Sequence, residues 1–371
     1  MKILVVCKTW PGSSRSGLSL TAAEHVKILF QLGHEVSIIG SQPEVLSEEL
    51  PVVNKVMVAS HGSGSVYSPS IVDTKKLNAT LINLNPDIVL LEGWQTSLTH
   101  AALKISYKNS VPVVMFSHGS SVHPFSKKIS DILRSLAWWP YKTFMLPSLI
   151  KRINLLMTLS LTSNSHRFYD RKLAGELKIP VGHYINIPVN WSENYVPRAR
   201  RKNQVLIIGY YSRIKNQLLA LSIAAEMSSH IHFLFIGSKT GFYYKKCLLL
   251  ARKLNLLSRV RFCDEIEVDI ADEIANSMVI FAPSVTEVLP LTLLEAMACG
   301  TPFVATPVGA NSDLKGGIFS NSEKDHMTAI NEIFENEKIW IELSASGRSH
   351  HKSEFTSKNL ESQLKFAISN A

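Results

Sequence analysis

The sequence predicts an α/β protein with two doubly wound domains, each a parallel sheet covered by helices. Three observations lead to this fold class. The chain has 371 residues, which is more than one hydrophobic core usually organises. Short apolar runs with strand character alternate with segments of helical apolar spacing. A polar, proline-containing stretch at residues 190–203 interrupts this alternation once, and the alternation then starts again.

The first half of the chain supplies the strands and helices of the first domain. Residues 18–32 carry apolar side chains at helical spacing, and Gly33 ends this predicted helix. The succession of strand, helix and strand implies a parallel sheet with helices on both faces. The predicted strands are residues 2–7, 36–39, 87–91, 111–116 and 155–160.

The second half repeats the pattern and sets the domain boundary. We predict domains at residues 1–195 and 196–371, with the final amphipathic helix, about residues 355–371, as a segment that could pack back on the first domain. Ligands of doubly wound sheets bind at the carboxyl ends of the strands, so we expect the site in the cleft between the domains. The predicted strands are residues 205–209, 231–237, 260–262, 278–281 and 302–305, and the predicted helices are residues 218–227, 243–254 and 291–298.

The composition is that of an ordinary globular protein, with 46% hydrophobic and 19% charged residues, which excludes a disordered or collagen-like chain. The four cysteines stand far apart without a C-x-x-C pair, so we expect buried free thiols and neither a disulfide nor a zinc site. Residues 1–8 lack the features of a secretory signal, and no uncharged apolar run reaches the roughly 20 residues of a transmembrane helix. These features favour a cytoplasmic protein.

The net charge of +9 is concentrated in one part of the chain. Residues 104–172 contain 11 Lys and Arg against 2 Asp and Glu, whereas residues 191–371 contain 20 against 19. A local basic surface indicates an anionic partner, which the charge alone does not identify.

Within this part, residues 125–152 interleave cations with bulky side chains that include Trp138, Trp139, Tyr141 and Phe144. The pattern is typical of a segment that lies on an anionic membrane surface, with aromatic rings at headgroup depth. The alternative is a pair of core-facing helices whose long cationic side chains reach around them to water. No nucleic-acid-binding module accompanies the segment, so we do not expect nucleic acid as a partner.

The most informative stretch for chemistry is residues 284–302. Pro290 suits the first position of a helix, which would leave the backbone N–H groups of Leu291 and Thr292 free at a helix amino terminus. Such a terminus is a site for phosphate. Glu287 precedes the helix and Glu295 lies one turn inside it, where a carboxylate can accept hydrogen bonds from vicinal hydroxyls. The alternative is a capped, buried helix with two solvated acids.

Four further residues follow predicted strands and are therefore candidates for the same site. Arg213 and Lys215 would face a pyrophosphate, although a solvated basic turn has the same pattern. Gly17 would let the backbone approach a phosphate or sugar, and otherwise forms a plain turn. His118 fits a position in the cleft, and otherwise is a turn histidine with satisfied hydrogen bonds.

These residues stand in an order that resembles glycosyltransferase family 4. Glu287 and Glu295, followed by Ala-Met-Ala-Cys-Gly-Thr-Pro, are similar to the E-x7-E signature of that family and its downstream block. The similar blocks extend over about 300 residues in the family's order. The other blocks are Gly33-His34-Glu35-Val36 after Gly17, Asn85-Pro86-Asp87, Val111-Pro112, His118-Gly119, Gly209 to Lys215, and Ser258-Arg259-Val260-Arg261-Phe262.

The resemblance implies a retaining, metal-independent glycosyltransferase of GT-B fold, in which two Rossmann-like domains face each other across a cleft. The acceptor would bind to the first domain and a nucleotide diphosphate sugar to the second, with no cofactor. By analogy, the acceptor is a glycan or lipid-linked saccharide of bacterial surface polysaccharide biosynthesis, and the enzyme is peripheral on the inner face of the cell membrane. The implied catalytic residues are Glu287 and His118, and the implied donor-binding residues are Gly17, Arg213, Lys215, Leu291, Thr292 and Glu295.

The chain departs from the family pattern in the signature loop. It has Val288-Leu289-Pro290 where the family has G-F-G, so both glycines that let the backbone approach the ligand are absent. Tyr210 replaces the usual arginine, whose place Arg213 could take, and Ser16 replaces the first glycine of the first loop. Because of these departures, the resemblance does not identify the donor sugar or its nucleotide. The departures also leave two alternatives, a GT-B epimerase that acts on the nucleotide sugar and a non-catalytic sugar-nucleotide-binding partner protein.

Overall fold

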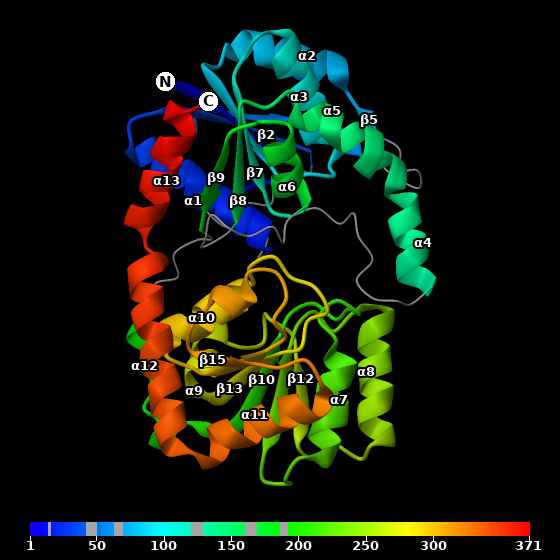
Figure 1. Cartoon of the computed structure of the whole chain (residues 1–371), viewed down its shortest axis with the longest axis vertical. Helices are drawn as coiled ribbons and strands as arrows, with labels where there is room; N and C mark the ends of the chain where they lie inside the picture. Colours follow the sequence, from blue (N-terminus) through cyan, green and yellow to red (C-terminus); the bar gives the residue numbers. More distant parts are fainter. Residues whose placement is uncertain (14–15, 42–49, 63–69, 120–128, 160–168, 186–191) are drawn as a thin grey trace. The chain divides into compact units, whose positions relative to one another are not determined.

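The structure is a computed structural model, and it describes residues 1–13, 16–41, 50–62, 70–119, 129–159, 169–185 and 192–371 (Figure 1). The chain forms two compact units. Unit 1 contains Met1–Ile187 and Ser357–Ala371, and unit 2 contains Pro188–Thr356. The chain therefore passes from one unit to the other twice.

The sheet of unit 1 has seven parallel strands in the order β3-β2-β1-β6-β7-β8-β9. The central strands are mostly apolar because both faces of the sheet are covered, and their polar residues stand at the strand ends. A two-stranded antiparallel sheet of β4 (Ser60–His61) and β5 (Ile71–Val72) lies beside α3 (Ser97–Lys108). The seven strands are β1 (Lys2–Cys7), β2 (Glu35–Gly40), β3 (Asn54–Met57), β6 (Ile88–Glu92), β7 (Val113–Ser117), β8 (Leu155–Leu159) and β9 (Val181–Tyr184).

Helices cover both faces of this sheet. Leu4 and Val6 of β1 belong to a buried cluster that also contains residues of α2, α3 and α5. On the other side α13, red in Figure 1, lies along α1 and β9, and the backbone N–H of Ile185 donates a 2.9 Å hydrogen bond to Oε1 of Gln363. The helices are α1 (Gly17–Gln31), α2 (Thr74–Leu84), α3 (Ser97–Lys108), α4 (Ile129–Ala137), α5 (Leu146–Ile150), α6 (Tyr169–Glu176) and α13 (Ser357–Ser369), with a π-helical turn, Tyr141–Met145, before α5.

The sheet of unit 2 has six parallel strands in the order β12-β11-β10-β13-β14-β15. In its hydrophobic core, residues of β10 and β13 pack against residues of α7, α8 and α11. Trp340 of α12 is buried in the same core. The strands are β10 (Lys202–Ile208), β11 (His232–Ile236), β12 (Val260–Cys263), β13 (Ser277–Ala282), β14 (Phe303–Ala305) and β15 (Gly317–Phe319). The helices are α7 (Gln217–Glu226), α8 (Gly241–Lys253), α9 (Ile270–Asn276), α10 (Leu291–Cys299), α11 (Glu323–Glu335) and α12 (Glu337–Glu354).

The predicted fold class is confirmed, since the chain forms two α/β domains with parallel sheets. The polar stretch predicted at residues 190–203 ends earlier than predicted, because β10 already begins at Lys202. The last helix begins at Ser357, and Pro290 caps α10 from outside instead of occupying its first position. The four cysteines are free and buried, as predicted. No helix among the described residues is long and apolar enough to cross a bilayer.

Candidate functional site

The candidate site in unit 2 lies where the strand order of the sheet reverses. β10 has β11 on one side and β13 on the other, so the connections that follow β10 and β13 leave the sheet in opposite directions. Ligands of doubly wound sheets bind at the carboxyl ends of such a pair of strands. The loops that follow β10 and β13 carry Lys215 and Glu287, respectively.

Lys215 and Glu287 form an ion pair in this position. Nζ of Lys215 lies 2.5 Å from Oε1 of Glu287, and the hydroxyl of Ser284 donates a 2.9 Å hydrogen bond to the same oxygen. The two loops are joined by a 2.7 Å hydrogen bond from the backbone N–H of Val285 to the carbonyl of Ile214. The Lys215 and Glu287 side chains keep 18% and 15% of their surface exposed, so both remain accessible to a ligand.

The amino terminus of α10 contributes to the same pocket. Pro290 is its N-cap and makes no side-chain capping bond, and Leu291 and Thr292 are its first two residues. Their backbone N–H groups therefore have no partner within the helix. Lys215, Glu287, Pro290 and Thr292 line one small pocket at the ends of β10 and β13. A cation and a helix amino terminus together favour an anionic ligand there.

Three predicted residues of this unit, Leu291, Glu295 and Arg213, lie outside the lining of the pocket. Glu295 is half-buried on α10, one turn beyond Leu291. Burial raises the pKa of the Tyr243 phenol on α8, and the nearby guanidinium of Arg213 acts in the opposite direction. Arg213 therefore acts electrostatically on Tyr243, whereas Lys215 pairs with Glu287.

Gly309 supports the Glu287 loop, although no sequence motif points to it. Its φ of +59° is in the left-handed region, and a Cβ built there would lie 2.7 Å from the carbonyl oxygen of Val288. The next residue, Ala310, donates its N–H to that oxygen at 2.8 Å. The backbone of Gly309 thus packs directly beneath residues 287–288, where any other residue would displace them. A single glycine in a polar turn carries no signal of this contact.

His118 lies beside the corresponding point of the sheet in unit 1. β1 is flanked by β2 and β6, so the strand order reverses between β1 and β6, and Glu92 is the last residue of β6. His118 follows the neighbouring strand β7, and its Nε2 lies 2.9 Å from Oε2 of Glu92. Nδ1 of His25, on α1, lies 2.8 Å from Oε1 of the same carboxylate. The two histidines therefore share one buried glutamate.

Glu92 is fully buried and ionised. Burial raises its pKa, but the charge of His25 and the hydrogen bonds from His118 and His25 outweigh burial and lower the pKa to about 2. Sequence reasoning missed Glu92 because it continues an apolar strand, and missed His25 because helical spacing alone does not show which face it uses. The partners lie 67 and 26 residues from Glu92 in the chain.

Gly17, the other predicted residue of unit 1, is the first residue of α1. It follows the loop after β1, and the side chain of Ser16 caps the helix by accepting a hydrogen bond from the N–H of Ser19 at 3.3 Å. Gly17 and His118 thus belong to unit 1, and the other six predicted residues belong to unit 2. No group of three or more side chains suited to hold a metal ion occurs among the described residues.

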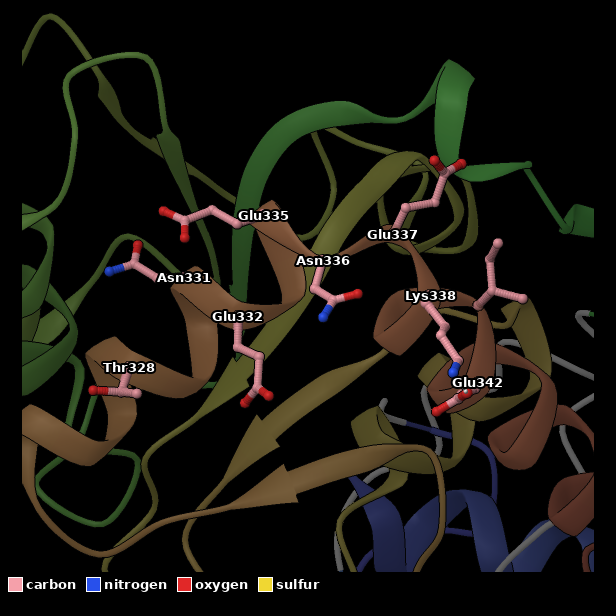
Figure 2. A pocket seen from close by; sticks show the side chains of 9 residues that line it. Thr328, Asn331, Glu332, Glu335, Asn336, Glu337, Lys338 and Glu342 are labelled. Carbon is pink, nitrogen blue, oxygen red and sulfur yellow. Dashed lines mark ion pairs between the residues drawn. The ribbon is translucent and has the colours of Figure 1, made fainter.

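A larger hollow in unit 2 has the wrong charge for a nucleotide. It lies on α11 and α12, and Figure 2 shows its carboxylates around the bend between these helices. Four glutamates and one lysine line it, so it disfavours a diphosphate. Its lining residues are Thr328, Asn331, Glu332, Glu335, Asn336, Glu337, Lys338, Ile341 and Glu342.

Comparison with known proteins gives a family match in part of the chain and structural matches over its whole length. Residues 202–336 match the family model described as glycosyl transferases group 1. None of the curated proteins matches the chain in sequence. Several solved structures match its whole length. HepE of Anabaena, in complex with UDP and glucose, has a TM-score of 0.76 and 15% identity, with 100% of both chains covered.

Two other solved structures are similar to the same extent. Sucrose-phosphate synthase of Thermosynechococcus elongatus has a TM-score of 0.73 and 15% identity over 99% of this chain and 98% of that chain. A glycosyltransferase of Rickettsia africae has a TM-score of 0.71 and 17% identity over 100% and 99%. The protein therefore has the GT-B fold, and part of its second unit, residues 202–336, is similar to the glycosyl transferases group 1 model.

Proposed function

We propose that the protein is a retaining, metal-independent glycosyltransferase of the family 4 type, which moves a sugar from a nucleotide diphosphate sugar to a hydroxyl group of a glycan. The observation that carries this proposal is the Lys215–Glu287 pair beside the amino terminus of α10, at the point where the strand order of the second sheet reverses. The group 1 match over residues 202–336 supports the transfer chemistry. The complexes of HepE with UDP and with UDP-glucose support a nucleotide sugar as donor.

The positive groups of the site suit the charge that the reaction produces. Cleavage of the bond between the sugar and the diphosphate leaves additional negative charge on the departing nucleotide. Lys215 and the backbone N–H groups of Leu291 and Thr292 are fixed where they can stabilise this charge. They take the part that a metal ion has in other phosphate-leaving reactions, and for this reason we propose a metal-independent transfer.

Glu287 suits the sugar end of the donor. Among the described residues, Lys215 and Ser284 donate hydrogen bonds to Glu287, and both bonds are to Oε1. The second oxygen, Oε2, can accept hydrogen bonds from sugar hydroxyls while Oε1 holds the carboxylate in place. In the retaining scheme the acceptor hydroxyl attacks the face from which the diphosphate leaves, and a phosphate oxygen takes its proton. His118 of unit 1 would bind a hydroxyl of the transferred sugar.

Two substitutions test the site. Lys215→Ala and Glu287→Gln should each lower kcat for transfer on the order of 100-fold or more, because each removes a group aimed at the leaving diphosphate or the sugar. Lys239→Ala is the matched control in the same unit, since Lys239 pairs with Glu267 at 2.5 Å on the surface. The donor is first found by a thermal-shift screen of nucleoside diphosphates and their sugars. Unchanged transfer by Lys215→Ala would contradict the site, and activity that requires added divalent metal would contradict a metal-independent transfer.

The same donor distinguishes the other candidate functions. An NMR time course of the wild-type protein with donor and no acceptor shows whether the donor is converted to an epimer. Conversion under these conditions identifies an epimerase. Tight donor binding with neither transfer nor hydrolysis across a broad acceptor set identifies a non-catalytic binding protein. Transfer that depends on an acceptor identifies the glycosyltransferase.

We further propose that the acceptor is lipid-linked and that the enzyme lies on the anionic inner face of the cell membrane, with α4 and the turn after it as the contact. α4 has an inverted pattern of burial, because Asp131 is only 4% exposed while its apolar residues face outward. The exposed residues are Ile129, Ile132, Leu133 and Leu136, followed by Trp139 and Phe144, whose rings pack edge to face at 5.7 Å.

Different residues of the basic segment support each of its two interpretations. Tyr141 is buried and Trp138 packs against the same core, as a core-facing helix pair requires. Trp139 and Phe144 remain 54% and 64% exposed, which suits the interfacial interpretation. Both acids of residues 104–172, Asp131 and Asp170, are buried, so the exposed charged groups of this part of the chain are cations. Residues 125–128 of the segment lie outside the described residues.

A flotation assay with vesicles tests the membrane contact. The protein should float with vesicles that contain anionic lipid at low salt and not with neutral vesicles, because aromatic insertion and cation attraction act together. Trp139→Ser and Leu133→Ser should reduce flotation at least several-fold. Phe242→Ser is the matched control, since Phe242 is 73% exposed on α8 of unit 2. Equal loss in all three variants, or no lipid-dependent flotation of the wild type, would contradict the proposal.

A further inference from the structure

We propose that Glu92 is a positioning residue that fixes the tautomer of His118 and so gives its second ring nitrogen, Nδ1, the role of hydrogen-bond acceptor for a sugar hydroxyl. The inference rests on the proposed function, because it assigns His118 a contact with the sugar. It concerns the residues behind His118, which no part of the sequence pattern identifies.

The tautomer follows from the chemistry of the carboxylate. An ionised carboxylate only accepts hydrogen bonds, so each imidazole nitrogen that faces it must carry a hydrogen. Nε2 of His118 faces Oε2 of Glu92 at 2.9 Å, and therefore donates to it. In the neutral ring the other nitrogen, Nδ1, then has a lone pair and no hydrogen. Among the described residues, none forms a hydrogen bond with Nδ1.

The carboxylate is held from its other side, so it cannot turn to release His118. Nδ1 of His25 donates to Oε1 of Glu92 at 2.8 Å, and neither side chain is exposed. The ring of His25 packs against Phe116 and Tyr184, at centroid distances of 4.6 Å and 5.6 Å. The hydroxyl of Tyr184 in turn donates to the carbonyl of Ser117 at 3.1 Å. His25 and Tyr184 thus anchor the carboxylate within the fold.

His118 stands at the boundary between this buried arrangement and the ligand side. Its side chain is 12% exposed while Glu92 is fully covered. The ring packs edge to face on Tyr184 at 5.8 Å, so its orientation is fixed as well as its tautomer. A hydroxyl has a hydrogen to donate, and a fixed, bare Nδ1 is a specific acceptor for it. A group that only accepts hydrogen bonds would be rejected at this position.

Glutamine has nearly the same shape as glutamate. Substitution of Glu92 by glutamine should nevertheless exchange the donor and acceptor roles of the two ring nitrogens of His118. The amide has one accepting oxygen and one donating NH₂ group, whereas the carboxylate has two accepting oxygens. If the amide oxygen keeps the hydrogen bond from buried His25, the NH₂ group faces His118 and Nε2 must accept. The hydrogen of His118 then moves to Nδ1, which becomes a donor.

The tautomer is measured directly. In protein labelled with ¹⁵N-histidine, long-range ¹H–¹⁵N spectra distinguish Nε2–H, Nδ1–H and doubly protonated rings, and the His118→Ala spectrum assigns the signal. We expect the Nε2–H form in the wild type and the Nδ1–H form in Glu92→Gln. The same His118 form in both proteins, or a doubly protonated ring in the wild type at neutral pH, would overturn the inference.

A double-mutant cycle on transfer separates positioning from loss of structure. Glu92→Gln should lower kcat roughly 10- to 100-fold with little change in KM, the usual effect of removing a carboxylate that orients a histidine. In the His118→Ala background the same substitution should have no further effect. Glu273→Gln is the control, because Glu273 is a buried carboxylate of unit 2 that accepts from Lys202 and from Gln204, each at 3.1 Å, and its effect should persist in both backgrounds.

The two readouts separate this inference from the proposed function. The spectra require no turnover, so a wild type that transfers no sugar but shows the expected change of tautomer contradicts the proposed function alone. An equal loss of kcat from Glu92→Gln with and without His118 shows a general structural role and overturns the positioning role.

Discussion

At the scale of single residues, the candidate site depends on contacts between a few atoms. One carboxylate oxygen of Glu287 receives both Lys215 and Ser284, and the backbone behind it rests on Gly309. Glu92 of unit 1 also contacts two side chains, because each of its carboxylate oxygens pairs with a different histidine. Such residues tolerate little change of shape, since their partners leave them no other arrangement.

Gly309 offers a test of this dependence. Gly309→Ala should lower transfer at least 10-fold, because the added Cβ would push the backbone of residues 287–288 away from Lys215. Gly241→Ala is the matched control in the same unit, since its φ of +83° carries the same backbone strain with no atom within 4 Å of a Cβ. Transfer rates and unfolding of both variants are compared. Equal loss of transfer in the two variants would show that strain alone is responsible.

At the scale of elements, the segment that precedes β10 is part of unit 2. The buried guanidinium of Arg201 donates to the carbonyls of Ser277 and Cys299 at 3.0 and 3.1 Å and to the hydroxyl of Thr301 at 2.6 Å. Burial lowers the pKa of Arg201 to about 10, and the group stays charged at neutral pH. The polar stretch before β10, which the sequence suggests as a linker, is therefore hydrogen-bonded through Arg201 to the unit that follows it.

Removal of this guanidinium should weaken unit 2. Arg201→Met should lower the free energy of unfolding by about 3 kcal/mol, because several charge-assisted hydrogen bonds are lost and their buried acceptors remain. Arg200→Met is the control, since its neighbour Arg200 is exposed. Denaturant unfolding of both variants measures the difference. A change of less than about 0.5 kcal/mol for Arg201→Met, the level of ordinary surface substitutions, would contradict the structural role.

The elements also show what the sequence can and cannot predict. The central strands β1, β6, β7 and β10 each contain at least four consecutive apolar residues, because helices cover both faces of each sheet. The edge strands β3 and β15 are short and half-buried, so their residues carry no such signal. Lys215 and Glu287 follow strands and were predicted together as site residues. The His25–Glu92–His118 arrangement could not be predicted, because it joins residues that are distant in the chain and are brought together only by the strand order.

At the scale of the whole molecule, the two units differ in which parts of the chain form them. Unit 2 is continuous, whereas unit 1 combines residues from both ends of the sequence. Its last element, α13, buries Leu360, Leu364 and Ala367 within unit 1. The stability of the amino-terminal fold therefore depends on residues more than 150 positions away from β9.

Leu364 tests this dependence. Leu364→Ala should destabilise unit 1 by about 2–5 kcal/mol through the cavity it leaves. Hydrogen exchange read by mass spectrometry should show lower protection in α1 and β9, with β10 and β13 unchanged. Lys365→Ala, at the neighbouring exposed position, should leave protection unchanged in both units. Loss of protection in unit 2 alone would contradict the placement of α13.

The return of the chain to unit 1 also sets the order in which the protein can be completed during synthesis. The ribosome delivers the whole of unit 2, Pro188–Thr356, before it delivers Ser357–Ala371. Unit 2 can therefore fold while the sheet of unit 1 still lacks the helix that covers β9. Until α13 arrives, the apolar surface that it covers stays open to water and to other chains. In the growing polypeptide, the first unit to begin folding is the last to be finished.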